Sequence, residues 1–413
     1  MEDSLKLRLK TKVMECLDMS KAMEDYQVSK VIDNCILEES NNTYIPLKEK
    51  MSLRKELFNT FRRFDVLTDL LEDEDITEIM VNGPDKIFVE RAGKTYKTDK
   101  FFESSERLDT VIQQIVAECN RRINDTEPIV DARLRDGSRV NIIVPPVALD
   151  GATVTIRKFS KQKIDMERLV ELGSIDKEVV KILDALVKSR YNIFISGGTG
   201  SGKTTFLNAL SDLIPQEERI ITIEDSAELQ LQNKTNLVRL ESRNANVEGK
   251  NNISIRNLIK NSLRMRPDRI IVGEVRDEAA IDMLAAMNTG HDGSLSTGHA
   301  NSSVDMLSRL QTMVLMGMDI PLLAVKQQIA SAVDIIIHLS RFIDGSRKVI
   351  NISEVVGMKE NEICVNTLFE YVETGKEQGR IKGNLRKVND LVNVGKLQGG
   401  GMLEVYMEAM NGI

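Results

Sequence analysis

Residues 197–205, GGTGSGKTT, have the residue types and spacing of a phosphate-binding loop, or P-loop. Glycines let the backbone turn its N–H groups toward a phosphate, Lys203 can reach the β- and γ-phosphate oxygens, and the Thr204 hydroxyl can ligate Mg²⁺. An apolar run at 193–195 precedes the loop and the helical pattern TTFLNALSDLI follows it, as this motif requires. These flanks argue against a glycine loop that only connects a strand to a helix. The residues expected to bind nucleotide are Gly197, Gly198, Thr199, Gly200, Ser201, Gly202, Lys203, Thr204 and Thr205.

Two later apolar runs, RIITIED and DRIIVGE, end in carboxylates. Glu224 and Asp225 end the first run, and Glu274 ends the second. Ligands gather at the carboxyl ends of strands in an open parallel sheet, so these acids are expected to face the P-loop. Glu224 could take a proton from an attacking water or orient it, and Glu274 could hold the hydration shell of Mg²⁺. For each acid, a helix cap or a solvated strand end is an equal alternative. Gly273 and Glu274 stand where many ATPases have an aspartate.

Two of the chain's 3 histidines, His291 and His299, lie in one small-residue stretch, TGHDGSLSTGHANSS. A metal site would need further ligands at suitable spacing, and none is evident in the sequence. A nucleophile triad would need a serine on a sharp elbow, and Ser294 and Ser296 lie in no such motif. A phosphate sensor fits better, because a histidine can donate a hydrogen bond to the γ-phosphate and lose it after hydrolysis. On these residues alone, a packed or solvated histidine pair stays open.

Composition narrows the class of protein. A chain of 413 residues predicts two or three domains. With 4% aromatic residues, no Trp and a net charge of −7, neither a base-stacking surface nor a spread nucleic-acid footprint is expected, so we predict no direct nucleic-acid partner. The four cysteines are scattered, without a CxxC pair, which predicts neither a zinc site nor a disulfide framework. No run of about 18 apolar residues occurs, and we expect a cytoplasmic protein whose membrane contacts are made through partners.

The hydrophobic pattern changes along the chain. Apolar residues at helical spacing open the sequence, two short apolar runs at 79–81 and 87–89 flank an Asn-Gly-Pro turn, and a helix is expected over 105–122. Past the polar segment SKQKIDMERL, helix, strand, glycine loop and helix alternate as in a parallel sheet. The pattern predicts an α/β fold whose main domain has a largely parallel sheet. The expected domains are an N-terminal helical bundle (1–50), a smaller α+β domain (51–160), a P-loop domain (161–360) and a loop-rich C-terminal extension (361–413).

Four stretches together resemble the secretion ATPase superfamily of type II and type IV secretion and pilus systems. They are GGTGSGKTT, ITIEDSAELQL, RMRPDRIIVGEVRDEAAIDMLAAMNTGHDGSLSTGHANS and QQIASAVDIIIHLSR. The likeness runs over residues 66–358, is densest over 192–341, and is greatest to the CpaF/TadA branch, which drives assembly of tight adherence (Flp) pili. The resemblance implies a RecA-like P-loop ATPase domain that uses ATP and Mg²⁺.

The resemblance also implies residue roles. The family's four nucleotide elements correspond here to residues 197–204, 222–228, 270–274 and 289–299. Glu224 would be the catalytic carboxylate, and Glu274 would ligate Mg²⁺ through water. His299 would contact the γ-phosphate region and His291 would support its loop. Arg139 in DGSRVNI and Arg157 in TIRKF match positions where relatives place arginines near the phosphates; exposed strand charge is their alternative.

The function implied is a hexameric ATPase motor at the cytoplasmic face of the membrane. It would pass domain motion to an inner-membrane platform protein that assembles or extrudes pilin subunits. A conjugation-type secretion ATPase that exports DNA or effector proteins shares every motif above. A nucleotide-gated binding scaffold with little turnover is the alternative of another class, and the presence of both Glu224 and Glu274 weighs against it.

Overall fold

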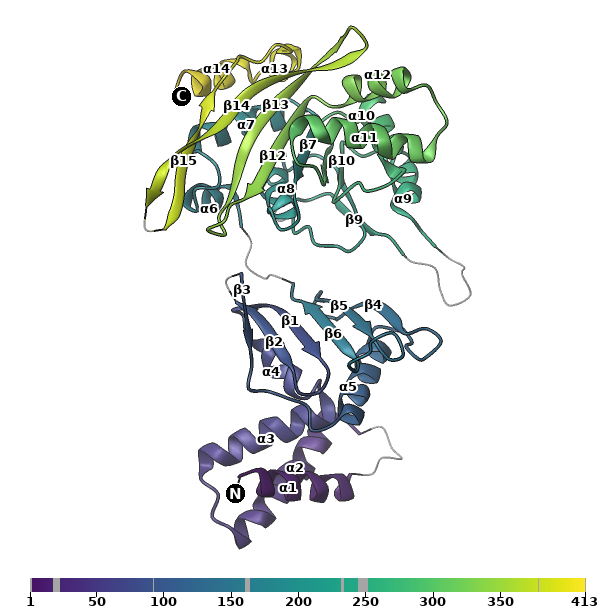
Figure 1. Ribbon diagram of the computed structural model, residues 1–413, viewed down its shortest axis with the longest axis vertical. Helices are drawn as coiled ribbons and strands as arrows, with labels where there is room; N and C mark the ends of the chain where they lie inside the picture. Colours follow the sequence, from purple (N-terminus) through teal and green to yellow (C-terminus); the bar gives the residue numbers. More distant parts are fainter. Residues whose placement is uncertain are drawn as a thin grey trace. The chain divides into compact units, whose positions relative to one another are not determined.

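The computed structural model describes residues 2–17, 23–91, 93–159, 164–231, 234–243, 252–377 and 379–412. The chain forms two compact units, Met1–Lys161 and Gln162–Ile413 (Figure 1). Of the helices in these described ranges, none combines the length and the apolar character needed to span a membrane.

The first unit opens with three helices, α1 (Glu2–Cys16), α2 (Asp25–Asn42) and α3 (Leu47–Arg62). Their apolar faces share one core, which confirms the predicted bundle; Leu9, Val13, Ile32 and Leu57 are among its buried residues. The expected boundary at residue 50 falls inside α3, which packs against α2. Helix α2 also continues through the polar residues of EESNN, so that only residues 43–46 interrupt the helices and Pro46 caps α3.

The α+β part of this unit is a six-stranded antiparallel sheet of order β3-β2-β1-β6-β5-β4. The predicted hairpin around the Asn-Gly-Pro turn is confirmed as β1–β2, with Val81 opposite Ile87. The helix expected over 105–122 ends at residue 118, and Asn120 just beyond it has a left-handed φ of 56°. Apolar residues of that helix and of the sheet form one core. The elements are α4 (Val66–Glu72), β1 (Ile76–Asn82), β2 (Ile87–Arg91), β3 (Lys94–Lys97), α5 (Ser105–Glu118), β4 (Ile129–Arg133), β5 (Arg139–Ile143) and β6 (Thr153–Arg157).

The second unit is built on a nine-stranded sheet of order β15-β14-β13-β12-β7-β11-β10-β8-β9. Figure 1 shows β15, β14, β13 and β12 side by side in this sheet. The run from β12 to β9 is parallel, as predicted, and its inner strands are buried throughout because helices cover both faces. One core includes α7 and α8, and the other α10, α11 and α12. The elements up to β12 are α6 (Met166–Glu171), α7 (Lys177–Lys188), β7 (Ile193–Gly197), α8 (Lys203–Ser211), β8 (Ile220–Glu224), β9 (Leu237–Glu241), α9 (Ile255–Ser262), β10 (Arg269–Val272), α10 (Ala279–Asn288), β11 (Leu295–Gly298), α11 (Ser303–Gly317), α12 (Leu322–Ala332) and β12 (Ile335–Arg341).

The C-terminal part differs from the expected loop-rich extension. Three long antiparallel strands, β13 (Arg347–Lys359), β14 (Glu362–Glu377) and β15 (Arg380–Lys387), continue the same sheet from β12. The short helix α13 (Gly395–Gly399) follows, and α14 (Leu403–Asn411) packs on α7. Residues 361–413 therefore belong to the P-loop unit, because buried residues such as Phe369 and Tyr406 join its core.

Candidate active site

The P-loop follows β7, a strand that is buried at every position. A Cβ atom at Gly197 would lie 2.5 Å from the Leu339 carbonyl oxygen and 2.6 Å from Ser201 Oγ, so only glycine fits where the chain leaves the strand. Gly202 has a left-handed φ of 93° and is the N-cap of α8; as a glycine it contributes no side-chain cap to the helix's first N–H groups. Such a loop and helix N-terminus bind phosphate through backbone N–H groups.

Lys203, the first residue of α8, lies 7% exposed within this loop. Its Nζ donates hydrogen bonds to the carbonyl oxygens of Gly197 (3.1 Å) and Gly198 (3.0 Å) and lies 3.3 Å from Nδ1 of His299. Burial lowers the pKa of Lys203, and the nearby Glu274 carboxylate opposes that shift. The ammonium group is thus held where phosphate oxygens would be bound.

His299 connects Lys203 to Glu274. Its Nε2 lies 3.0 Å from Oε1 of Glu274, and Oε2 of Glu274 accepts a hydrogen bond from Arg276 at 2.6 Å. Burial lowers the pKa of His299, so the ring is neutral at neutral pH. An ammonium group cannot accept a hydrogen bond, so Nδ1 accepts from Lys203 and the ring proton is on Nε2, toward Glu274. Lys203, His299 and Glu274 therefore form one polar cluster.

Glu224, the last residue of β8, is 3% exposed. Its Oε1 accepts hydrogen bonds from the backbone N–H groups of Glu228 and Leu229, each at 2.9 Å. Its Oε2 is buried without a hydrogen-bond partner among the described residues. Burial raises the pKa of Glu224 to about 6, although those two backbone bonds act to lower it. A carboxylate with this pKa can accept a proton from water near neutral pH.

Gly273 explains why the second carboxylate motif lacks the usual aspartate. A Cβ atom at Gly273 would lie 2.9 Å from Cγ of Glu224, so the glycine leaves room for that side chain. The next residue, Glu274, then reaches His299. The segments ITIED and IIVGE therefore pack against each other on the adjacent parallel strands β8 and β10.

The strand order brings the predicted residues together. Strands β7, β11, β10 and β8 are consecutive neighbours and parallel. The residues at or just past their carboxyl ends are Gly197, His299, Glu274 and Glu224, respectively. These ends share one edge of the sheet, where ligands bind in open α/β folds.

Three of the predicted site residues are not part of this cluster. His291 precedes β11, whereas His299 follows it, so the structure places His291 at the opposite, amino-terminal end of that strand. The four-residue strand β11 therefore lies between His291 and His299. Arg139 and Arg157 lie opposite each other on β5 and β6 of the first unit, whereas the cluster lies within the second unit.

Two arginines near the P-loop were not predicted. Arg347, at the start of β13, donates a hydrogen bond from Nε to the Gly200 carbonyl oxygen at 2.9 Å. Nη1 of Arg341, at the end of β12, lies 3.6 Å from the position of a Cβ atom on Gly200. Both follow from β12 being the neighbour of β7, with Leu339 opposite Gly197. Sequence alone could not give that pairing, because the two strands are separated by most of the domain.

Comparisons with known proteins identify the family of the chain. The family model described as type II/IV secretion system protein matches residues 62–382. A putative conjugal transfer protein of Mycobacterium tuberculosis is 33% identical over 310 residues, which are 74% of this chain and 87% of that protein. The conjugal transfer protein TrbB of Rhizobium radiobacter is 32% identical over 301 residues, 72% of this chain and 89% of its own.

Solved structures show the same fold. The crystal structure of the pilus retraction motor PilT with bound ADP has a TM-score of 0.53 and 18% identity, and the match covers 84% of this chain and 89% of that one. The fold is therefore the RecA-like fold of secretion ATPases. Because the family model spans most of both units and the P-loop cluster is intact, this chain belongs to the type II/IV secretion system family and is an ATP hydrolase.

Proposed function

We propose that this chain is the hexameric, cytoplasmic motor that powers assembly of a Tad/Flp-type pilus. The observation that carries the motor proposal is the row of strand ends bearing Gly197, His299, Glu274 and Glu224, which provides a phosphate loop and two acids side by side. The pilus assignment is supported by the sequence resemblance to the CpaF/TadA branch over the same motifs. Pilin subunits would be the cargo, and inner-membrane platform proteins would be the partners that receive the motion.

In this proposal Glu224 activates the attacking water. Its unbonded Oε2 is the acceptor for the water's proton, and a pKa of about 6 keeps most of the group ionised at neutral pH. Backbone bonds to Oε1 fix the carboxylate in place. His299 contacts the γ-phosphate region beside Lys203. Its other contacts are Glu274 and Lys203, so His299 can transmit the loss of that phosphate to these two residues.

The oxygen donors at this edge fit Mg²⁺. The Thr204 hydroxyl lies in the first turn of α8, and the Glu274 carboxylate, at the end of the neighbouring strands, has its Oε1 3.0 Å from Nε2 of His299. Mg²⁺ prefers oxygen ligands and keeps several waters, so we propose Thr204 as a direct ligand and Glu274 as a ligand through water. When bound, the ion would neutralise charge on the phosphate oxygens.

We further propose that Arg139 and Arg157 supply positive charge to the nucleotide during the motor's cycle. Arg133, Arg139 and Arg157 lie opposite one another across β4, β5 and β6. An arginine guanidinium is always charged and can neutralise phosphate oxygens as their bonds break, which is the role proposed for Arg139 and Arg157. The ring itself is tested by sizing the protein with and without a nonhydrolysable ATP analogue. A monomer under all conditions contradicts the hexamer.

The hydrolysis proposal predicts a graded set of phosphate-release rates. Glu224→Gln and Lys203→Ala are expected to lower kcat by at least about 100-fold, because they remove the proton acceptor and the phosphate contact. Asp225→Asn is the matched control: this carboxylate is one residue away but exposed, and its loss is expected to cost less than about threefold. Wild-type rings without turnover would support the binding-scaffold alternative instead.

Export of DNA or effector proteins is the second candidate, because relatives at 32–34% identity are described as conjugal transfer proteins. Deletion of the gene distinguishes the two. Loss of surface pili that is restored by the wild type, and not by Glu224→Gln, supports the pilus motor. Loss of plasmid or effector transfer with normal pili would contradict it.

A further inference from the structure

Two arginines lie beside the P-loop on the hairpin formed by β12 and β13. Arg341 ends β12, Arg347 begins β13, and the two stand opposite each other in the antiparallel pair. Besides its bond from Nε to the Gly200 carbonyl oxygen, Arg347 has its Cδ 3.2 Å from the position of a Cβ atom on Gly202. Nη1 of Arg341 lies beside Gly200 on the same loop. The hairpin therefore brings two guanidinium groups to the glycines of a phosphate-binding loop.

The turn between these two arginines is ordered by hydrogen bonds. Oδ1 of Asp344 accepts bonds from the Ser346 hydroxyl at 2.6 Å and the Ser346 backbone N–H at 2.9 Å, and Oδ2 accepts from the Ile381 N–H of β15 at 2.6 Å. The bonds from Ser346 and Ile381 lower the pKa of Asp344 to about 2. Phe342 packs on Tyr371 of β14, with ring centroids 5.6 Å apart. An ordered turn loses little freedom when its side chains bind a ligand.

The arginines and the acids lie on opposite sides of the P-loop strand. Strand β7 has β12 on one side and β11 on the other, and β10 and β8 follow β11. His299, Glu274 and Glu224 belong to the β11, β10 and β8 side. In a P-loop the lysine reaches the β- and γ-phosphates, and backbone N–H groups surround the α- and β-phosphates. Hydrolysis of the γ-phosphate falls on the side of the acids, which leaves the arginines on the side of the α- and β-phosphates.

We propose that Arg341 and Arg347 bind the α- and β-phosphates of the nucleotide from within the P-loop unit. A guanidinium group is always charged, and its planar fork of N–H donors matches a pair of phosphate oxygens. Because ADP keeps both of these phosphates, the contacts hold ATP and ADP alike, and they act on nucleotide affinity rather than on the hydrolytic step. The inference rests on nucleotide binding by the P-loop, which is part of the proposed function.

Equilibrium binding of ADP to the full-length Arg341→Ala variant tests the inference without turnover. Arg341 is the cleaner position, because Arg347 also bonds to the Gly200 carbonyl and so helps to shape the loop. The Kd for ADP is expected to rise about 5- to 30-fold, with kcat at saturating ATP within about threefold of wild type. Arg347→Ala is expected to raise this Kd at least as much.

Arg386→Ala is the matched control. Arg386 is an exposed arginine on β15 of the same sheet, and β14, β13 and β12 separate it from β7. Its loss is expected to change the Kd for ADP less than about twofold. Equal ADP affinities in Arg341→Ala and Arg386→Ala overturn the inference.

Pyrophosphate separates a phosphate contact from a contact with the nucleoside. It has two phosphates and no base, so Arg341→Ala is expected to weaken pyrophosphate and ADP binding by the same factor. A loss confined to ADP overturns the inference, because a guanidinium group can also stack on an aromatic base. A loss confined to a nonhydrolysable ATP analogue overturns it too, since that result places the arginine at the γ-phosphate. Undiminished ADP affinity in Lys203→Ala would instead contradict the P-loop site of the proposed function.

Discussion

Glu224 is buried, has a raised pKa and has one carboxylate oxygen without a hydrogen bond among the described residues. These properties lower the stability of the fold but favour proton transfer from water. Folding removes the carboxylate from water and leaves Oε2 without a partner among the described residues, which costs free energy. The same arrangement leaves an acceptor ready for a proton at neutral pH. His299 and Lys203 show the same pattern in milder form, because burial lowers the pKa of each. Such shifts concentrate at active sites.

The substitution Glu224→Gln is expected to stabilise the fold at pH 8 while it abolishes hydrolysis. The pKa of Glu224 rises from its ordinary 4.5 to about 6 on folding, so ionised Glu224 costs about 2 kcal/mol of unfolding free energy above pH 6. The carboxyl group is protonated in both states well below pH 4.5, so the cost is lost as pH falls through this window. Urea unfolding of both proteins at pH 8 and pH 4.5 measures the change. A difference that does not shrink at the lower pH contradicts the assignment.

At the scale of elements, the sequence predicted those parts whose chemistry is local. A P-loop needs a buried strand before it and a helix after it, and β7 and α8 are where residues 193–195 and TTFLNALSDLI placed them. The acids at the ends of RIITIED and DRIIVGE followed from the strand pattern. His299 also followed from its motif, and the order of strands then brought all of these residues together.

Other elements depend on pairing between distant segments, which local patterns do not encode. The end of strand β14, residues 373–377, is exposed, and the polar sequence VETGKE there is typical of a loop. This segment is a strand because it pairs with β13 and β15. The contacts of Arg341 and Arg347 with the P-loop depend on the same hairpin. His291 is an example of the opposite kind. Its nearness to His299 in sequence suggested that the two are close in space, but a four-residue strand separates them.

Gly273→Ala tests the packing between β8 and β10. The added methyl group would meet Cγ of Glu224 at 2.9 Å, so the carboxylate must shift. We expect kcat to fall about 10- to 100-fold because the proton acceptor is misplaced, with an unfolding free energy lower by about 1–3 kcal/mol. Gly399→Ala in α13 is the control, since its methyl group meets no atom within 4 Å. Normal kcat in Gly273→Ala would show that Glu224 tolerates displacement.

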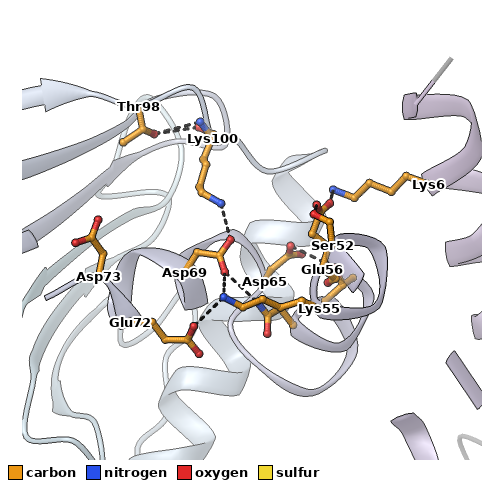
Figure 2. A network of polar contacts seen from close by, with 12 residues as sticks. Lys6, Ser52, Lys55, Glu56, Asp65, Asp69, Glu72, Asp73, Thr98 and Lys100 are labelled. Atoms are coloured by element: carbon orange, nitrogen blue, oxygen red, sulfur yellow. Dashed lines mark hydrogen bonds and ion pairs between the residues drawn. The ribbon is translucent and has the colours of Figure 1, made fainter. Parts of the chain in front are cut away.

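At the scale of the whole molecule, the two compact units divide the chain differently from the four expected domains. In the first unit, the helical bundle and the α+β part are joined by a polar network that Figure 2 shows. Asp69 of α4 pairs with Lys55 of α3 at 3.0 Å and with Lys100, which follows β3, at 2.7 Å. Glu72 pairs with Lys55 at 2.9 Å. The bundle and the six-stranded sheet are therefore connected within one compact unit, residues 1–161.

Asp69→Asn tests that conclusion. Burial acts to raise the pKa of Asp69, but the bonds with Lys100 and Lys55 outweigh it and hold the pKa below its ordinary 3.8. The carboxylate therefore contributes stability above pH 3.8, and this contribution is lost as pH falls through the lower, folded-state pKa. We expect Asp69→Asn to reduce the unfolding free energy by about 1 kcal/mol at pH 7, measured by urea unfolding, with kcat for ATP within about twofold of wild type.

Glu72→Gln is the matched control for Asp69→Asn, since Glu72 bonds to the same lysine but is 59% exposed. Its replacement is expected to cost less than about 0.5 kcal/mol, because water and salt screen an exposed pair. Equal losses in the two variants would mean that the network is only surface charge and does not join the bundle to the sheet. A loss in Asp69→Asn that does not shrink as pH falls below 3.8 would contradict the role of the ionised carboxylate, because its contribution is lost as pH falls through the lowered, folded-state pKa.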